Sequence, residues 1–247
     1  MANRYSLSGD RRKSPIGTIV KGFLELIVIV IGIYIAFQLE NNREAKHKAD
    51  LERSYLEQLL EEVKINEEEL RADQDERKEQ LTLLKKLLVT PLRQVDSDTI
   101  QKAVDALFTV RLYSPTDAVY QDLVSSGNLG ILKSDAFKRI LMNYRRALAR
   151  VPSTEDRDLK LISEQLEPYL MEKQLLSFLE PHRDLEEISI SQDQKDRMIR
   201  QLLRDRKFID LVYLRIHTIQ DVIFFENPMQ WHLRNMRQLL EEELDPK

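Results

Sequence analysis

Histidines and carboxylates are the residues most able to support catalysis or metal binding here, and their spacing gives little support for either. The four histidines fit no His-Glu-x-x-His pattern of a zinc protease. Glu44 and His47 match the Glu-x-x-His spacing that di-iron helical bundles use twice, but the sequence holds no second copy. Cysteine is absent, which excludes thiolate metal ligands, cysteine nucleophiles and disulfides. We therefore expect no bound metal.

Nucleotide-binding loops are also missing from the sequence. Neither Gly-x-x-x-x-Gly-Lys nor Gly-x-Gly-x-x-Gly occurs, which excludes nucleotide binding by those routes. Phe224, Phe225 and Trp231 could line a pocket, but aromatic residues on a helical stripe more often belong to a core. The sequence thus predicts no catalytic residue and no cofactor, and it does not favour an enzyme.

Glu25 is the most unusual ionisable residue because it lies inside an apolar run. The 17 residues from Phe23 to Leu39 read FLELIVIVIGIYIAFQL, and Glu25 is their only charge. An ionisable group in such a run is a functional hypothesis by default, with Lys21 four residues earlier as its partner. The simpler interpretation is an interfacial glutamate that Lys21 neutralises. Gly32 and Ala36 form a small-x-x-x-small pair that would let two helices approach closely.

The apolar run predicts a transmembrane helix over residues 22–39. Its twelve Leu, Ile, Val and Phe side chains contribute about −4 to −7 kcal/mol to insertion, whereas a carboxylate near the edge costs under about 3 kcal/mol. No Ala-x-Ala site follows, so we expect an uncleaved anchor. Five basic residues precede the run and four follow it closely, which favours a cytosolic N-terminus over residues 1–21.

Composition predicts a helical, acidic, water-soluble part after the anchor. Charged residues make up 32% of the chain, and the residues after position 22 carry a net charge of about −8, which disfavours nucleic-acid binding. Only two glycines follow Gly32, too few for the turns of a sheet-rich fold. The predicted class is all-α: a transmembrane helix that continues into a long helix, packed in a helical bundle with a small helical lobe.

The long helix should occupy residues 40–90, because no Gly or Pro interrupts the chain between Leu39 and Pro91. Its apolar residues form two lanes of seven-residue spacing, typical of a coiled-coil or bundle seam. Glu67, Gln74 and Arg77 fall in the same lanes, so the middle of the seam is polar. This favours packing against other helices of the same chain at both ends.

Residues 91–151 should form the lobe. A helix is expected near Ser97–Phe108, and a second should start with Ser114 as N-cap and Pro115 as first helical residue. That helix should end at Ser126, with Gly127 as its left-handed cap. Ser134 should cap the next helix.

Residues 152–247 should form helices that pack back on the long one. We expect them near 154–177, with a kink at Pro168, and near 192–206, with a looser segment around Pro181 and Ile188. A final stripe beginning at Ile209 demands burial, and the residues from Asn227 to Gln230 indicate a restart with Pro228 in the first turn.

The anchor resembles an uncharacterised bacterial family of single-pass proteins that is defined as a domain of unknown function. The family's start reads roughly Gly-Glu-Ile-x-Leu-Val-Val-Ile-Gly-Ile-x-Ile-Ala-x-Gln, followed by Asn-Asn-Trp. The matching residues here are Glu25, Ile31, Gly32, Ile33, Ile35, Ala36, Gln38, Asn41 and Asn42. Leu24 replaces the family's glycine, and its tryptophan is missing.

A second stretch is similar to the same family. Its matching residues are Pro115, Thr116, Tyr120, Leu123, Ser126, Gly127 and Leu129. The resemblance implies a one-span anchor with a helical domain in a bacterial inner membrane, and the count of basic residues favours a periplasmic position for that domain. It adds weight to Glu25, Gly32 and Gln38, and it implies no activity.

Two functions agree with these patterns. The first is a membrane-anchored interaction or scaffold protein that self-associates in the lipid bilayer. The alternative is an extracytoplasmic sensory or regulatory module that acts with a partner membrane protein.

Overall fold

The computed structural model describes residues 15–90, 95–176 and 191–245, with side chains from Phe23 onwards in the first range. Within these ranges the secondary structure is helical and contains no strand, which confirms the predicted all-α class. The predicted loose segment around Pro181 and Ile188 lies outside the described residues. Contacts divide the chain into two compact units, Met1–Arg53 and Ser54–Lys247.

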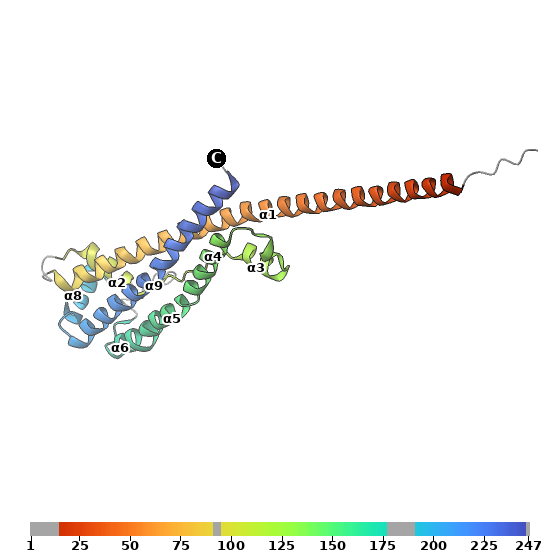
Figure 1. Cartoon of the computed structure of the whole chain (residues 1–247). Helices are drawn as coiled ribbons and strands as arrows, with labels where there is room; N and C mark the ends of the chain where they lie inside the picture. Colours follow the sequence, from red (N-terminus) through yellow and green to blue (C-terminus); the bar gives the residue numbers. More distant parts are fainter. Residues whose placement is uncertain (1–14, 91–94, 177–190, 246–247) are drawn as a thin grey trace, which may run out of the picture. The chain divides into compact units, whose positions relative to one another are not determined.

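The helices are labelled in Figure 1. In chain order they are α1 (Pro15–Val89), α2 (Ser97–Phe108), α3 (Ala118–Ser125), the 3-10 turn η1 (Asn128–Ile131), α4 (Asp135–Leu148), α5 (Val151–Leu161), the π-helical turn η2 (Ile162–Leu166), α6 (Glu167–Glu172), α8 (Gln192–Leu202) and α9 (Arg206–Leu244).

Helix α1 joins the predicted anchor and the predicted long helix without interruption. It stops shortly before Pro91, whose ring disfavours helical backbone in the residue before it. Within the second unit the expected seam is buried: Leu56, Val63, Leu70 and Leu84 are at most 6% exposed. The polar seam residues Gln74 and Arg77 are equally buried, at 1% and 4%. The polar middle of the seam is therefore packed as well.

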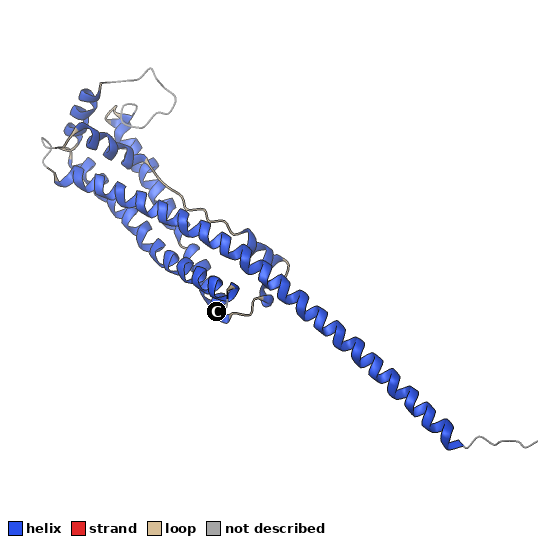
Figure 2. Cartoon of the chain, turned by 90° about the horizontal axis from the view of Figure 1, so that it is seen from above, coloured by secondary structure: helices blue, strands red, loops and turns tan. Residues whose placement is uncertain are grey.

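Helix α9 runs antiparallel to α1 in the second unit, and both views show the two helices side by side (Figures 1 and 2). Arg237 Nη1 lies 3.3 Å from Glu67 Oε2, and Arg77 Nη1 lies 2.8 Å from Glu226 Oε1. Residue numbers therefore rise along α1 from Glu67 to Arg77 while those of their partners fall along α9 from Arg237 to Glu226, so the two helices run in opposite directions. Two ion pairs thus join the last helix to the first in this register.

Two apolar regions lie on either side of the polar middle of the seam. One is a core cluster built from α1, α2, α5, η2, α6, α8 and the first half of α9. In it the rings of Tyr169 and Phe208 stack with centroids 6.2 Å apart. The other region lies toward the start of the second unit, and its buried side chains include Leu59, Val63, Leu123, Phe137, Leu141, Leu233, Met236 and Leu240.

Two helix starts that have a side-chain cap agree with prediction. Helix α2 has the predicted bounds, and its N-cap Asp96 accepts a hydrogen bond from Thr99 N at 2.8 Å. Ser134 caps α4 as predicted, accepting from Phe137 N at 3.2 Å. The predicted start at Ser114 and Pro115 is wrong, because α3 begins three residues later at Ala118.

The predicted restart of the last helix at Asn227 is also wrong. Helix α9 passes through Pro228 without a break. Pro228 cannot donate the hydrogen bond that Phe224 O would accept, which normally disrupts a helix. Both residues are exposed here, so water can satisfy that carbonyl, while Met229 and Leu233 on the opposite face stay buried.

The predicted helix near 154–177 is present but begins earlier and changes pitch. Pro152 occupies its first turn, and α5 starts at Val151. The expected kink is the π-helical turn η2, which ends two residues before Pro168. The helix predicted over 192–206 ends sooner, at Leu202, because Asp205 begins α9 by accepting a hydrogen bond from Lys207 N at 2.9 Å.

Candidate functional site

No side chain of the apolar run inside α1, from Phe23 to Leu39, is buried in the structure. All residues from Phe23 to Leu39 are exposed, although their mean hydropathy reaches 2.1 over the most apolar window. Among the described residues this is the one helix long and apolar enough to cross a membrane. Large exposed apolar patches on a protein mark interaction or membrane sites.

Glu25, Gly32 and Ala36 lie on one face of this run. With 3.6 residues per turn, Gly32 is rotated about 20° and Ala36 about 20° from Glu25, in opposite directions, whereas Gln38 is rotated about 140° away. A Cβ added to Gly32 would meet nothing within 4 Å. Three of the four predicted site residues, Glu25, Gly32 and Ala36, thus share one face of the helix, and Gln38 lies on another.

Glu25 borders a shallow hollow on the same face, together with Leu24, Val28 and Ile29. Its predicted partner Lys21 has a side chain outside the described ones. Within the described part of the chain, neither Glu25 nor Gln38 forms a hydrogen bond or ion pair. Glu25 is therefore a carboxylate on an otherwise apolar surface.

The predicted turn residues lie in the α3 region, which side chains of α1 hold in place. Gly127 has φ of +73°, as predicted for a left-handed cap, and its N–H donates to Val124 O at 3.2 Å. Asn66 of α1 clamps the segment after Pro115: its Nδ2 donates to Thr116 O at 2.7 Å and its Oδ1 accepts from Thr116 N at 2.8 Å. These hydrogen bonds replace the helical start that was expected there.

Two further side chains of α1 complete this docking. Glu62 Oε2 accepts from Val119 N at 2.9 Å at the start of α3. Tyr55 Oη donates to Asp122 Oδ2 at 2.7 Å and accepts from Asn128 Nδ2 at 3.1 Å. Burial raises the pKa of Glu62 above its ordinary value, although the Val119 hydrogen bond acts against it.

Arg77 is the centre of a buried polar layer between α1, α5 and α9. Its Nη1 donates to Glu226 Oε1 at 2.8 Å, and its Nη2 donates to Arg111 O at 2.6 Å and Glu155 Oε1 at 3.4 Å. Glu155 also accepts from Tyr113 N at 2.8 Å. One guanidinium therefore ties three helices and the connection before α3 together.

Glu226 is the most perturbed acid of this layer. Its side chain is fully buried, and burial raises its pKa to about 7, although Arg77 lowers it. Within the described residues its Oε2 has no hydrogen-bond partner. A perturbed, incompletely satisfied carboxylate is typical of functional sites, but structural ion pairs show the same signature.

Arg215 anchors α9 to α2 and α5 in the same layer. Its Nε donates to Leu107 O at 3.2 Å and its Nη2 to Thr109 O at 2.6 Å. Its Nη1 pairs with Asp158, which also accepts a hydrogen bond from Thr218 Oγ1. Desolvation lowers the pKa of Arg215.

Sequence reasoning identified Arg77 but missed its partners Glu155 and Glu226, as well as the Arg215–Asp158 pair. The available signal was a charged residue at a position whose helical neighbours are apolar, as for Arg215 beside Leu211 and Val212. The expectation that Phe224 and Trp231 belong to a core is wrong: they are 69% and 56% exposed.

No metal site is found in the described ranges, where no three His, Asp or Glu side chains are placed to hold an ion. Glu44 and His47 are exposed, and Glu44 pairs with Lys48 at 3.5 Å. No family model matches the chain, and neither a curated protein nor a solved structure is detectably similar to it.

Proposed function

We propose that this protein is a membrane-anchored helical scaffold that self-associates through the apolar run of α1. The observation that carries the proposal is an exposed apolar helix with Glu25, Gly32 and Ala36 on one face. Small residues one turn apart favour close packing of two helices in lipid. The resemblance to the bacterial single-pass family adds support at Glu25 and Gly32.

A carboxylate within such an interface strengthens association in lipid. The apolar core of a bilayer offers Glu25 no water, so a second polar group on a neighbouring helix is its most favourable partner. A second copy of the chain brings Glu25 to the same depth. A protonated carboxyl on one copy can then donate a hydrogen bond to the other.

Disulfide crosslinking tests this interface because the sequence contains no cysteine. The variant Gly32→Cys, in the full chain and in native membranes, is expected to form disulfide-linked dimers under mild oxidation. Tyr34→Cys is the matched control, because two residues along a helix place it about 200° around the axis.

Equal crosslinking of both variants, or of neither, would contradict a specific interface at Gly32. Light scattering of the uncrosslinked chain in a mild detergent provides the second measurement. A dimer or larger assembly that Gly32→Leu converts to a monomer supports the proposal, and a wild-type monomer counts against it.

A further inference from the structure

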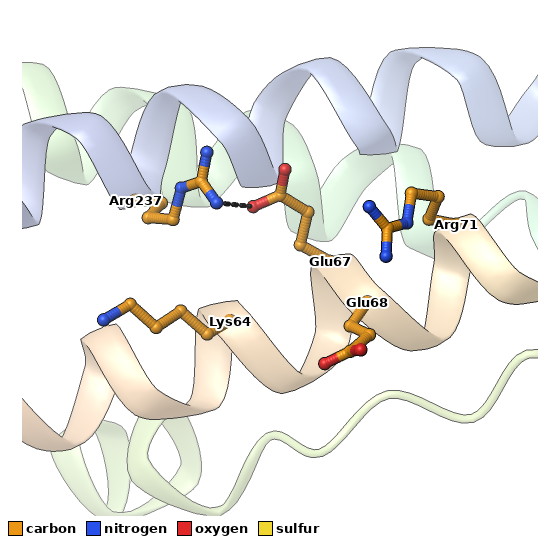
Figure 3. Close-up of a pocket in the computed structure, with 5 residues that line it drawn as sticks. All are labelled: Lys64, Glu67, Glu68, Arg71 and Arg237. Carbon is orange, nitrogen blue, oxygen red and sulfur yellow. Dashed lines mark ion pairs between the residues drawn. The ribbon is translucent and has the colours of Figure 1, made fainter.

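A hollow of about 320 Å3 lies between α1 and α9 in the second unit. Figure 3 shows the side chains that line it. They are Lys64, Glu67, Glu68, Arg71 and Arg237. Lys64, Glu68 and Arg71 recur at the spacing that places them on one face of α1, and we refer to this hollow as the basic cleft.

The basic cleft carries a surplus of positive charge on an acidic protein. Three cations, Lys64, Arg71 and Arg237, line the cleft. Two carboxylates, Glu67 and Glu68, oppose them. The cleft therefore has a formal charge of +1, whereas the whole chain has −4. Arg234 lies beside it, with its Nε 3.9 Å from Glu67 Oε1.

Glu67 orients one of the cations. Its carboxylate is 14% exposed and lies 3.3 Å from Arg237 Nη1, as the dashed line in Figure 3 marks. The Arg237 side chain remains 40% exposed, so its other N–H groups stay open to a ligand. Glu67 thus holds a guanidinium at the wall of the cleft without enclosing it.

Lys64 and Arg71 are not neutralised by near neighbours. In the described part of the chain neither forms an ion pair with a carboxylate within 4 Å, and Asp75, four residues beyond Arg71, pairs with Lys78 at 2.9 Å. In Figure 3 the Arg71 guanidinium lies on the other side of Glu67 from Arg237, and Glu68 points away from α9. Cations thus lie on both sides of Glu67.

We propose that the basic cleft binds a phosphate dianion, held by Arg71, Arg237 and Lys64. Guanidinium groups donate in a planar fork that matches phosphate oxygens, and lysine adds a point charge. A phosphate group carries about −1.5 to −2 at pH 7, so the net positive charge of the cleft attracts it. This ligand site goes beyond the scaffold proposal and does not depend on it.

The hollow exceeds the size of phosphate alone and lies at the lower end of the range for small-molecule sites. It therefore accommodates a phosphate monoester, either a small soluble molecule or the headgroup of phosphatidic acid. Both present the same dianion, so the experiment has one arm for each source.

Isothermal titration calorimetry on the full chain in uncharged detergent tests the site, with sodium phosphate as the probe at constant ionic strength. The wild type is expected to bind with saturation. Arg71→Gln should weaken binding about tenfold, the effect of losing one charge-assisted hydrogen bond. Arg71 is exposed, so this change should leave the thermal midpoint unaltered.

Two variants control for charge. Arg139→Gln removes the same charge from an exposed position of α4 and should leave the affinity unchanged. Glu68→Gln removes a negative charge from the cleft and should tighten phosphate binding severalfold. The proposal would be overturned if Arg71→Gln and Arg139→Gln lowered the affinity for phosphate equally. Weaker phosphate binding by Glu68→Gln would also overturn it.

The second arm adds short-chain phosphatidic acid to the same micelles. Tighter binding than for phosphate, weakened by Arg71→Gln, identifies the lipid headgroup as the source. Equal or weaker binding, with the same sensitivity, identifies soluble phosphate. The proposal fails if neither probe saturates or if Arg71→Gln alters the affinity of neither.

Discussion

Glu226 couples the stability of the second unit to pH. Its pKa is raised from the ordinary 4.5 to about 7 because the side chain is buried. A carboxyl whose pKa is higher in the folded state contributes stability that is fully present below pH 4.5 and is lost as the pH rises through about 7. Glu155, whose pKa burial also raises, acts in the same direction.

We therefore predict that Glu226→Gln makes stability less dependent on pH. The free energy of unfolding of the wild type should fall on the order of 3 kcal/mol through Glu226 between pH 4.5 and 7.5. The amide cannot ionise, so most of this fall should disappear, leaving the part due to Glu155. Denaturant unfolding of the full chain at several pH values measures this change in the free energy of unfolding.

Glu61→Gln, on the exposed side of α1, is the control and should keep the wild-type dependence of stability on pH. The same dependence in Glu226→Gln as in the wild type would contradict the assignment to Glu226.

Arg215 is the cation whose removal should cost most. It is 1% exposed and pairs with Asp158, itself 4% exposed. Arg215→Met should lower the free energy of unfolding by about 3–5 kcal/mol, because Asp158 would stay charged and buried without a partner.

Adding Asp158→Asn to Arg215→Met should recover part of this loss, since the stranded charge disappears. A double-mutant cycle by denaturant unfolding measures the coupling. Additive effects of the two changes would show that the ion pair is not the source of the loss.

Sequence reasoning at the residue scale was right about patterns and incomplete about partners. The lanes of α1 placed Arg77 in a buried seam, and turn chemistry placed Gly127 in the left-handed region. The partner Glu226 lies 149 residues from Arg77 along the chain. No local pattern connects residues so far apart, so their pairing emerges only from the packing of α9 on α1.

At the scale of elements, α9 shows why a correct local signal gave a wrong boundary. Asn227 and Pro228 form a typical helix start, yet the helix continues through them. Whether the helix continues depends on the face that the proline occupies. On the exposed face, water can bind the Phe224 carbonyl that Pro228 leaves without a backbone donor. A buried stripe on the opposite face, from Met229 to Leu240, holds the helix against α1.

We predict that Pro228→Ala raises the free energy of unfolding by about 1–3 kcal/mol, because it restores a donor to Phe224 O and removes the proline ring. Thermal or denaturant unfolding provides the measurement. Asn227→Ala separates the two interpretations of this region. It should be neutral or slightly stabilising within a continuous helix, whereas loss of a true N-cap would cost about 1 kcal/mol.

Helix α3 illustrates a different error of prediction. Ser114 and Pro115 carry an N-terminal signature, but the backbone at Thr116 is held by the Asn66 side chain instead. A long-range amide clamp thus replaces one turn of helix. Sequence could predict the helix and its end at Gly127, but the competing partner on α1 is visible only in the folded chain.

At the scale of the whole molecule, the proposed orientation has a cytosolic N-terminus and a second unit outside the cytosol. The thin excess of basic residues before the apolar run supports it. We predict that single cysteines at positions 54 and 191 react with a membrane-impermeant maleimide in intact cells, and that one at position 8 reacts only after lysis. Both Ser54 and Ser191 are exposed, so folding does not hide them. The reverse pattern would invert the orientation.

The arrangement of α1 and α9 determines how the second unit would resist a pulling force. The antiparallel register, in which Glu67 meets Arg237 and Arg77 meets Glu226, puts Ser54 and Leu244 at the same end of the helix pair. A force that pulls Ser54 and Leu244 apart would separate the two helices from that end, so the contacts would break one helical turn after another. They would not all break together. The force needed to unfold the second unit would then be set by the single layer of contacts that is hardest to break, the one that contains the Arg77–Glu226 ion pair. It would not increase with the number of contacts along the whole helix pair.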